Sequence, residues 1–313
     1  MRTGFLADEE IDEGPVGPVA ARLLPYALLA EQAKFDHYYF KGADLDQRII
    51  SDYCGRKRPC DEMIVASSIL SEWKLIGAWE GWENLSERFN LRCANNLCDP
   101  LDGLAVQVWI KRQPLCEEAV LSFRGTKGNV ENWLSNFHWL SRHLGIIDQY
   151  DQVRYIANDL VDLVNSECGE RKPRIAAVGH SLGGGLAQHA AYQNAVIRRI
   201  YGFNPTIVTG SLDFGRQKLK KGKDGLVVER VYESGEILQF PRRVMGKINP
   251  ISRCNPRTVN IRFNFEHGGA SDQHRITNMA RQLIEASDFE APKKVPMADE
   301  PCNTASRASS ARP

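Results

Sequence analysis

The chain has 313 residues, of which 42% are hydrophobic and 25% are charged, so it can form one large domain with a sizeable core. Its net charge of +1 gives no reason to expect a nucleic-acid partner. No run of about 18 apolar residues is present, which predicts that no helix crosses a membrane. The acidic N-terminus lacks the apolar segment of a secretory signal, so we expect a cytoplasmic protein, or one exported without a cleavable signal.

The sequence pattern divides the chain into four parts. Residues 1–17 are acidic and rich in glycine and proline, which predicts a flexible arm. Residues 18–100 carry apolar residues at helical spacing and predict an N-terminal helical region that packs on the core. Residues 101–290 form the predicted core, and residues 291–313, rich in proline, serine, alanine and arginine, predict a disordered tail.

Two helices are predicted in the N-terminal region. Apolar residues recur at helical spacing from Pro18 to Phe40, and Pro25 either disturbs this helix or begins it. A second helical pattern covers residues 61–90. The region is therefore expected to be a helical extension of the core.

The core pattern predicts an α/β fold with a mainly parallel sheet. It begins with a hairpin of two strands, after which strands and helices alternate. The predicted strands are 104–110, 119–123, 174–178, 200–204, 226–232 and 258–263, and the predicted helices are 129–143, 151–167, about 182–198 and 272–287. This alternation favours a central sheet with helices on both faces.

Residues 179–183 read Gly-His-Ser-Leu-Gly and lie between a predicted strand and a predicted helix. They have the form of a nucleophile elbow, a sharp turn that presents a serine at the tip of a strand. Glycine is needed beside the serine because side chains would collide there, and the next helix directs its N–H groups at a developing oxyanion. Ser181 is the candidate nucleophile, unless this is only a glycine-rich turn.

A serine nucleophile needs a general base, and the base needs an acid that orients it. In enzymes with this elbow, the acid and then the histidine follow the serine in the chain. His274, which opens the last predicted helix, and His267, in a glycine-bearing loop, are both candidates for the base. His189 lies about two turns along the helix after the elbow, so we expect it to be structural.

The acid should follow the penultimate predicted strand. Glu233 and Glu236 both meet this condition, and Gly235 provides a turn that would direct Glu236 inward, so we prefer Glu236. The oxyanion needs two donors. The backbone N–H of Leu182 is one, and Thr126, at the end of a predicted strand, is the candidate for the other unless it only caps a helix.

Several motifs occur in a characteristic order: Phe123-Arg124-Gly125-Thr126, Asn132-Trp133-Leu134 and the run from Gly179 to Ala187. Together they resemble the class 3 lipases, the fungal triacylglycerol-lipase-like α/β-hydrolases, and the resemblance covers roughly residues 20–287. It implies the α/β-hydrolase fold. By this resemblance Ser181 is the nucleophile, His274 is the base, and Thr126 lines the oxyanion hole. Family members have aspartate where Glu236 stands, and a glutamate still reaches an imidazole.

The resemblance also implies a lid over the site. The candidate lid side chains are Trp133, Phe137 and Trp139, which either form an amphipathic helix that moves aside at a lipid surface or belong to the core. The loop 217–223 carries four lysines, which fits a solvated loop or contact with anionic head groups. A transient contact with a membrane surface is therefore among the expectations.

These observations predict a serine hydrolase that cleaves carboxylic esters of lipids through an acyl-enzyme. This chemistry needs no metal or organic cofactor, and the expected partner is a lipid or another acyl ester. One alternative is a phospholipase that acts on membranes, as an exported effector. The other is a catalytically silent lipase-like module for binding or signalling.

The chain has eight cysteines, none of them in a C-x-x-C motif or at zinc-binding spacing from histidines. The pairs Cys54/Cys60 and Cys93/Cys98 would close small loops in an oxidising compartment. Because no export signal is visible, we expect the thiols to be reduced.

Overall fold

The structure is a computed structural model of the whole chain. The residues that it describes are 4–7, 10–12, 16–33, 61–80, 87–88, 104–125, 149–206, 223–235, 238, 256–265 and 269–287.

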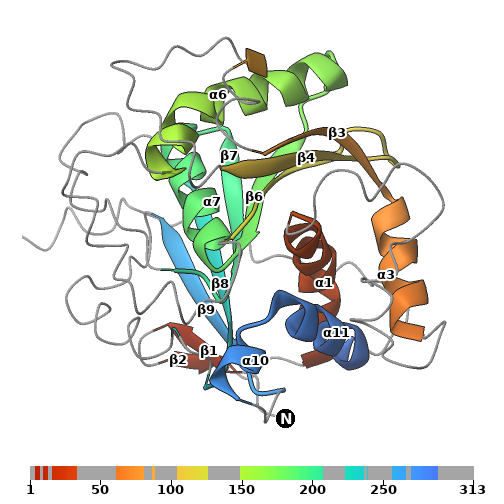
Figure 1. The fold of residues 1–313 in the computed structure, drawn as a ribbon, viewed down its shortest axis with the longest axis vertical. Coiled ribbons are helices and arrows are strands. Elements are labelled where there is room, and N and C mark those ends of the chain that lie inside the picture. Colours follow the sequence, from red (N-terminus) through yellow and green to blue (C-terminus); the bar gives the residue numbers. More distant parts are fainter. Residues whose placement is uncertain are drawn as a thin grey trace, which may run out of the picture.

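The described strands form one sheet in the order β2-β1-β9-β8-β7-β6-β5-β4-β3. Their bounds are β1 Gly4–Ala7, β2 Glu10–Asp12, β3 Trp73–Glu80, β4 Ala105–Lys111, β5 Glu118–Phe123, β6 Arg174–His180, β7 Ile197–Phe203, β8 Val227–Glu233 and β9 Arg257–Phe263. The strands from β5 to β9 are parallel, whereas β3 and β4 at one edge and β1 and β2 at the other are antiparallel. The predicted α/β-hydrolase fold with a mainly parallel sheet is confirmed (Figure 1).

Helices cover both faces of this sheet. Their bounds are α1 Val16–Gln32, α3 Asp61–Ser71, α6 Gln149–Cys168, α7 Leu182–Gln193, α10 Ala270–Gln273 and α11 Ile276–Ala286. The helices α6 and α7 lie on one face, and α1, α3 and α11 lie on the other (Figure 1).

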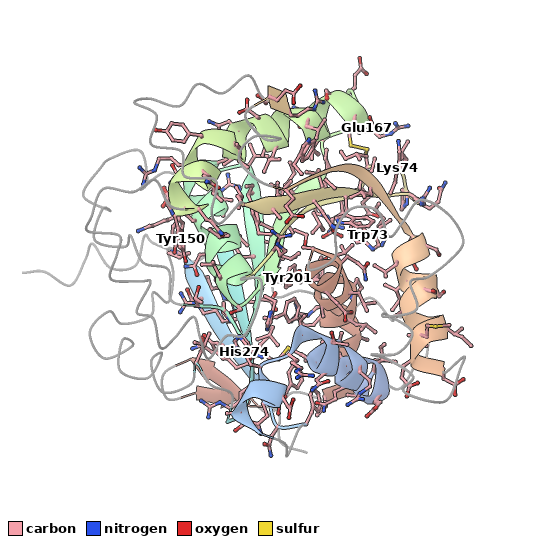
Figure 2. All side chains as sticks on the ribbon, in the orientation of Figure 1. Trp73, Lys74, Tyr150, Glu167, Tyr201 and His274 are labelled. Carbon is pink, nitrogen blue, oxygen red and sulfur yellow. A yellow bond between two sulfur atoms is a disulfide. The ribbon has the colours of Figure 1, made fainter. Side chains whose placement is uncertain are left out.

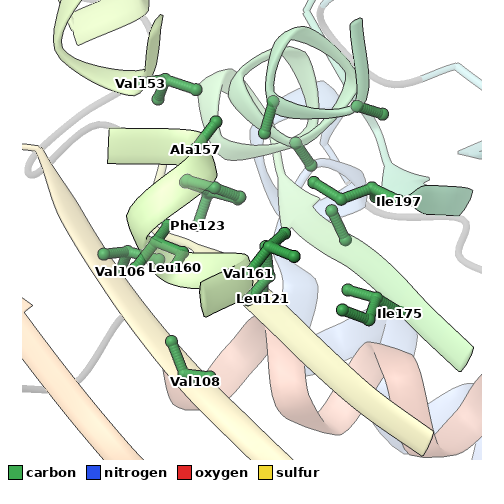
Figure 3. Packing of buried hydrophobic residues seen from close by; sticks show 14 of the residues in the cluster. Val106, Val108, Leu121, Phe123, Val153, Ala157, Leu160, Val161, Ile175 and Ile197 are labelled. Atoms are coloured by element: carbon green, nitrogen blue, oxygen red, sulfur yellow. The ribbon is translucent and has the colours of Figure 1, made fainter. Parts of the chain in front are cut away.

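Buried residues of the central strands alternate between two hydrophobic cores. Leu121 and Phe123 of β5 pack in the core beneath α6 and α7, together with Val153 and Leu160 of α6 (Figure 3). Val120, which directly precedes Leu121, belongs to the core on the opposite face. Alternation of this kind, with both faces buried, is typical of a central parallel strand. It holds the carboxyl end of β5 rigidly next to that of β6, where the site lies.

The helix predicted over residues 61–90 is wrong over residues 73–80, while residues 81–86 and 89–90 lie outside the described residues. Residues Trp73–Glu80 form the edge strand β3, which pairs antiparallel with β4 and has a bulge between Leu75 and Gly77. Leu75 packs on the face of α1, whereas Ile76 and Trp79 pack on the face of α6. The bulge breaks the two-residue period of a strand, so the sequence pattern resembled a helix.

Other expectations about the elements also need correction. Helix α1 runs through Pro25 without ending or beginning there. The arm expected for residues 1–17 contains β1 and β2, and β1 pairs with β9. The last predicted helix is broken between α10 and α11 at His274 and Arg275, and the helix after the elbow ends at Gln193. The predicted tail, 291–313, lies outside the described residues.

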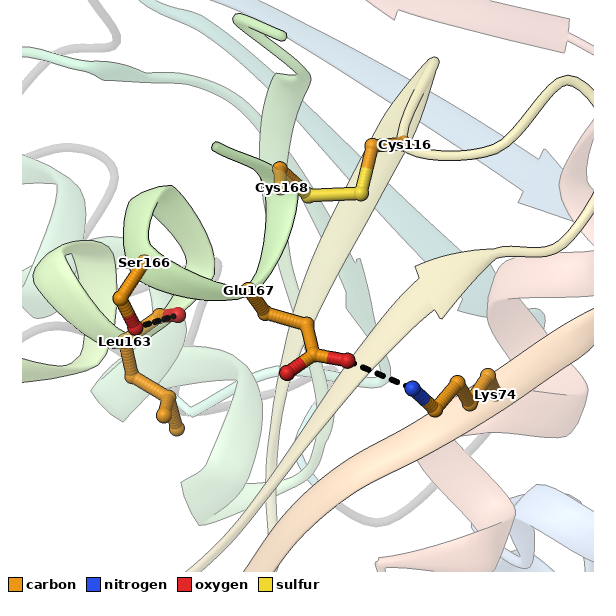
Figure 4. The surroundings of a disulfide bond; sticks show 6 residues. All are labelled: Lys74, Cys116, Leu163, Ser166, Glu167 and Cys168. Atoms are coloured by element: carbon orange, nitrogen blue, oxygen red, sulfur yellow. Dashed lines mark hydrogen bonds and ion pairs between the residues drawn. A yellow bond between two sulfur atoms is a disulfide. The ribbon is translucent and has the colours of Figure 1, made fainter. Parts of the chain in front are cut away.

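The expectation of reduced thiols is wrong for one pair. Cys116, in the turn between β4 and β5, and Cys168, at the end of α6, form a disulfide across 52 residues, with their Cα atoms 5.7 Å apart (Figure 4). The packing of α6 on the sheet brings the two together, and no local spacing in the sequence indicates such a pair. The pairs Cys54/Cys60 and Cys93/Cys98 lie outside the described residues.

Candidate active site

Ser181 lies in a sharp turn between β6 and α7. Its backbone has φ 55° and ψ −123°, in the left-handed half of conformational space that residues with a side chain rarely adopt. Hydrogen bonds hold it there: the N–H of Ser181 donates to the carbonyl of Phe203, 3.0 Å away, and the N–H groups of Gly184 and Thr206 donate to the carbonyl of Ser181, each at 3.0 Å. This is the geometry of a nucleophile elbow.

The two glycines of the motif are required by contact. A Cβ on Gly183 would lie 2.2 Å from the carbonyl oxygen of Phe123, and one on Gly179 would lie 2.3 Å from the carbonyl oxygen of Gly183. The glycines thus allow the end of β5 to approach the elbow. Gly125 is part of the same contact, since a Cβ there would lie 3.5 Å from the Cβ of Ser181.

Of the two oxyanion-hole candidates, the structure describes Leu182 but not Thr126. Leu182 is the first residue of α7 and directly follows Ser181. Thr126 lies outside the described residues, but its neighbour Gly125 lies beside Ser181. Arg124, which is buried, forms an ion pair of 2.9 Å with Glu80, so the end of β5 is tied to the end of β3. The sequence reading missed this pair because it placed Glu80 in a helix.

His274 lies at the junction of α10 and α11, with its side chain buried (Figure 2). Nε2 of His180 donates a hydrogen bond to the carbonyl oxygen of His274, and the two imidazole rings lie 4.8 Å apart between centroids. His180 directly precedes Ser181, so the structure brings the candidate base to the elbow. The alternative base, His267, lies outside the described residues.

His189 is the first histidine after Ser181 in the chain. It is buried in α7, with its ring against the edge of Tyr150 at 5.4 Å between centroids and its Nε2 3.3 Å from the amide nitrogen of Gln193. These contacts join α6 and α7 within the core and agree with the expected structural role.

The two candidate acids have different settings. Glu233, at the end of β8, is only 3% exposed, and its Oε1 accepts a hydrogen bond of 2.7 Å from the N–H of Phe265, so it is not a solvated strand-end charge. Glu236 lies outside the described residues. Its neighbour Gly235 has φ 89°, and a Cβ there would lie 2.7 Å from Oε1 of Gln273. The turn that leads to Glu236 therefore contacts the residue before His274.

Asn204, the residue after β7, belongs to no sequence motif that predicts a role in the site. Its buried side chain joins the end of β8 to the segment that carries His274. An asparagine between the end of a strand and a proline is a signal for a left-handed turn, and its φ is 42°. Which segments that turn would join depends on the order of strands in the sheet, which the local sequence does not contain.

The remaining expectations concern the lid and metal binding. The candidate lid side chains Trp133, Phe137 and Trp139 lie outside the described residues. Among the residues that are described, no group of three or more His, Cys, Asp or Glu side chains could hold a metal ion. In the same part of the chain, no helix combines the length and the apolar character needed to cross a membrane.

Comparison with known families identifies the segment that carries the elbow. Residues 75–209 match the Tle-like phospholipase domain. The matched segment of this phospholipase-like domain begins within β3, ends after β7 and includes Ser181, whereas Glu236 and His274 follow it. This match confirms the predictions of a lipase-like α/β-hydrolase and of a hydrolase of lipid carboxylic esters, as a family and a reaction class.

Solved structures that this chain matches are distant from it, with low sequence identity and TM-scores below 0.5. Lipase II from Rhizopus niveus is 15% identical, with 77% of this chain and 79% of that chain covered and a TM-score of 0.44. The esterase from Pyrobaculum calidifontis is 12% identical, with 88% and 98% covered and a TM-score of 0.32. Acetyl xylan esterase 1 from Thermoanaerobacterium is 12% identical, with 78% and 99% covered and a TM-score of 0.29. No curated protein is significantly similar to this sequence.

Proposed function

We propose that this protein is a phospholipase that releases fatty acid from phospholipids, with Ser181 as nucleophile, His274 as base and Glu236 as acid. The observation that carries the proposal is the backbone of Ser181, which has φ 55°. It lies in a turn so tight that no side chain would fit at position 179 or 183. The match of this segment to a phospholipase-like domain favours phospholipids over triglycerides.

The proposed reaction proceeds in two steps. Oγ of Ser181 attacks the ester carbonyl carbon while its proton passes to the imidazole of His274, and the leaving alcohol takes that proton as the bond to it breaks. Water then attacks the acyl-enzyme by the same route and releases the fatty acid. The N–H groups of Leu182 and Thr126 stabilise the oxyanion in both steps, and Glu236 holds the imidazole.

Two further features concern where the protein acts and how it meets its substrate. The Cys116–Cys168 disulfide supports the exported alternative over a cytoplasmic protein, because disulfides persist in oxidising compartments. A brief contact with the membrane surface delivers the substrate, and the candidate lid residues Trp133, Phe137 and Trp139 and the lysine-rich loop 217–223 would make that contact.

The test compares fatty acid release from phosphatidylcholine–phosphatidylglycerol vesicles with release from triglyceride emulsions, for the wild type and Ser181→Ala. The proposal predicts faster release from the vesicles, with lysophospholipid as the second product and no release by Ser181→Ala. Preference for triglyceride would make the protein a lipase in the narrower sense. Release by Ser181→Ala equal to the wild type would disprove the assigned nucleophile.

A further inference from the structure

Asn204 is a buried polar residue at the centre of the candidate site. It is 0% exposed, and its φ of 42° lies in the left-handed region, which asparagine tolerates better than most residues. Its backbone N–H donates to the carbonyl of Val231, 2.7 Å away. The turn after β7 is therefore fixed against β8.

The side-chain amide of Asn204 uses both its acceptor and its donor. Oδ1 accepts a hydrogen bond of 2.9 Å from the N–H of Glu233, at the end of β8. Nδ2 donates to the carbonyl oxygens of Gln273, at 3.1 Å, and His274, at 3.4 Å. One amide thus joins the strand that leads to Glu236 with the segment that carries His274.

The carbonyl oxygen of His274 accepts from two side chains. One donor is Nδ2 of Asn204, and the other is Nε2 of His180, the residue before Ser181. The backbone of His274 is therefore tied to the nucleophile elbow on one side and, through Asn204, to the acid strand on the other. These bonds restrict the direction from which its imidazole reaches the site.

We propose that Asn204 is a positioning residue, which sets the imidazole of His274 relative to Ser181 and the acid by holding the backbone of the base segment to the end of β8. This inference rests on the proposed function of Ser181 and His274. Few side chains could replace asparagine in this role, because a hydrogen-bond acceptor and a donor are needed together in one plane. A misplacement of about 1 Å is sufficient to lower a catalytic rate about 100-fold.

The test uses Asn204→Asp, which keeps the size of the side chain and the acceptor for the N–H of Glu233 but cannot donate while ionised. Hydrolysis of a water-soluble p-nitrophenyl ester gives kcat and KM over a pH series. Above neutral pH, kcat is expected to fall about 10- to 100-fold, with KM within about threefold of the wild type, since binding of substrate does not involve the amide.

Lowering the pH should partly restore the kcat of Asn204→Asp. Burial favours a protonated carboxyl at position 204, which is 0% exposed in the wild type, and its O–H can donate to the carbonyl of His274 in place of the amide. Among the described residues that bond Asn204 or its partners, the other titratable side chains are His180, Glu233 and His274. All three are present in the wild type as well, so the ratio of kcat in Asn204→Asp to kcat in the wild type isolates the new carboxyl and is expected to rise severalfold as the pH falls.

Two further variants separate positioning from folding. Asn204→Gly tolerates the left-handed backbone and buries no charge, so it should lose kcat at every pH without recovery, and it decides the question if Asn204→Asp does not fold. Asn194→Asp makes the same chemical change at the far end of α7, where the side chain bonds Asn158, and should keep wild-type kcat.

The outcomes distinguish the two claims. A wild type that hydrolyses the ester, together with Asn204 variants that keep its kcat and its pH profile, would overturn the positioning role alone. A folded wild type without activity on any ester would overturn the proposed function and this inference with it.

Discussion

The strained backbone of Ser181 is maintained by hydrogen bonds from three segments: the end of β7, the first turn of α7 and the segment after β7. A residue with a side chain at positive φ costs on the order of 1–3 kcal/mol and persists only where its surroundings over-determine it. Here Phe203, Gly184 and Thr206 provide those contacts. The strain is local, and it serves to direct one hydroxyl away from the sheet.

The identity of the acid is decided by a pair of matched substitutions. We expect Glu236→Gln to lower kcat about 10³- to 10⁴-fold, because the imidazole loses the carboxylate that orients it. Glu233→Gln should keep kcat within about tenfold and destabilise the protein by only about 1 kcal/mol, because the amide oxygen still accepts from the N–H of Phe265 but the bond is no longer charge-assisted. Steady-state kinetics and urea unfolding measure both effects, and the opposite pattern would assign the acid to Glu233.

How far the sequence predicts the site depends on how local each residue's role is. The elbow around Ser181 is encoded by five consecutive residues, and the position of His274 follows from the order of elements. The role of Asn204 and the ion pair of Arg124 with Glu80 arise only when distant strands become neighbours. They follow from the register of β7 with β8 and of β3 with β4, which no local pattern in the chain contains.

At the scale of elements, α1 is joined to the sheet by charged as well as apolar groups. Arg22 forms a bidentate ion pair with Glu229 of β8, with N–O distances of 2.7 and 2.8 Å, and Arg199 of β7 also contacts Glu229, at 3.2 Å. The ring of Tyr26 stacks on that of Tyr201 of β7, and its hydroxyl donates to Glu118 at 2.7 Å. Glu118 is the first residue of β5, whereas Arg199, Tyr201 and Glu229 lie within β7 and β8.

The ion pair gives a prediction for stability. We expect Glu229→Gln to lower the free energy of unfolding by about 3–5 kcal/mol, because two partly buried guanidinium groups lose their carboxylate. The matched control is Glu167→Gln, which removes the exposed Lys74–Glu167 pair and should cost less than about 1 kcal/mol (Figure 4). Denaturant unfolding measures both, and equal effects would show that the buried pair contributes no more than a surface pair.

The stacked tyrosines predict a loss of stability at alkaline pH. Burial, together with the negative charge of Glu229, raises the pKa of Tyr201 to about 12, and burial raises the pKa of Tyr26 above its usual value. Between about pH 10 and 12 the unfolded chain loses the proton of Tyr201 while the folded chain retains it, so stability falls as the pH rises. The contribution of Tyr201 is present below about pH 10 and amounts to about 3 kcal/mol.

The measurement is the pH dependence of the unfolding free energy of Tyr201→Phe. This variant should lose about 3 kcal/mol less stability than the wild type between about pH 10 and 12. Tyr155→Phe, which changes an exposed tyrosine of α6, is the control and should follow the wild type. A wild-type slope in Tyr201→Phe would mean that Tyr201 loses its proton as readily in the folded protein as in the unfolded chain.

The helices and strands were predicted best where the spacing of apolar residues is regular. The amphipathic pattern over residues 151–167 and the apolar run before Ser181 gave α6 and β6 with nearly correct ends. The prediction was wrong where a bulge interrupts β3 and where α1 passes through Pro25. In both places tertiary packing outweighs the local preference, since α1 and β3 are held by the sheet and its neighbours.

At the scale of the whole molecule, the disulfide joins the hairpin of β4 and β5 to α6. Cross-linking across 52 residues lowers the entropy of the unfolded chain, and this corresponds to about 4 kcal/mol of stability. We expect the double substitution Cys116→Ser/Cys168→Ser to lower the free energy of unfolding by that amount, measured with denaturant. It should keep kcat, because both cysteines lie at the end of the sheet away from Ser181. Loss of kcat in the folded variant would contradict this separation of stability from the site.

Reaction with a fluorophosphonate probe shows whether Ser181 is an activated nucleophile. The wild type, Ser181→Ala and His274→Ala are each incubated with the probe in the presence of phospholipid vesicles, and the modified residue is located by mass spectrometry. We expect one probe per wild-type chain, attached to Ser181, and none on either folded variant. A folded wild type that stays unmodified, or that is modified on another residue, would show that Ser181 is not the nucleophile.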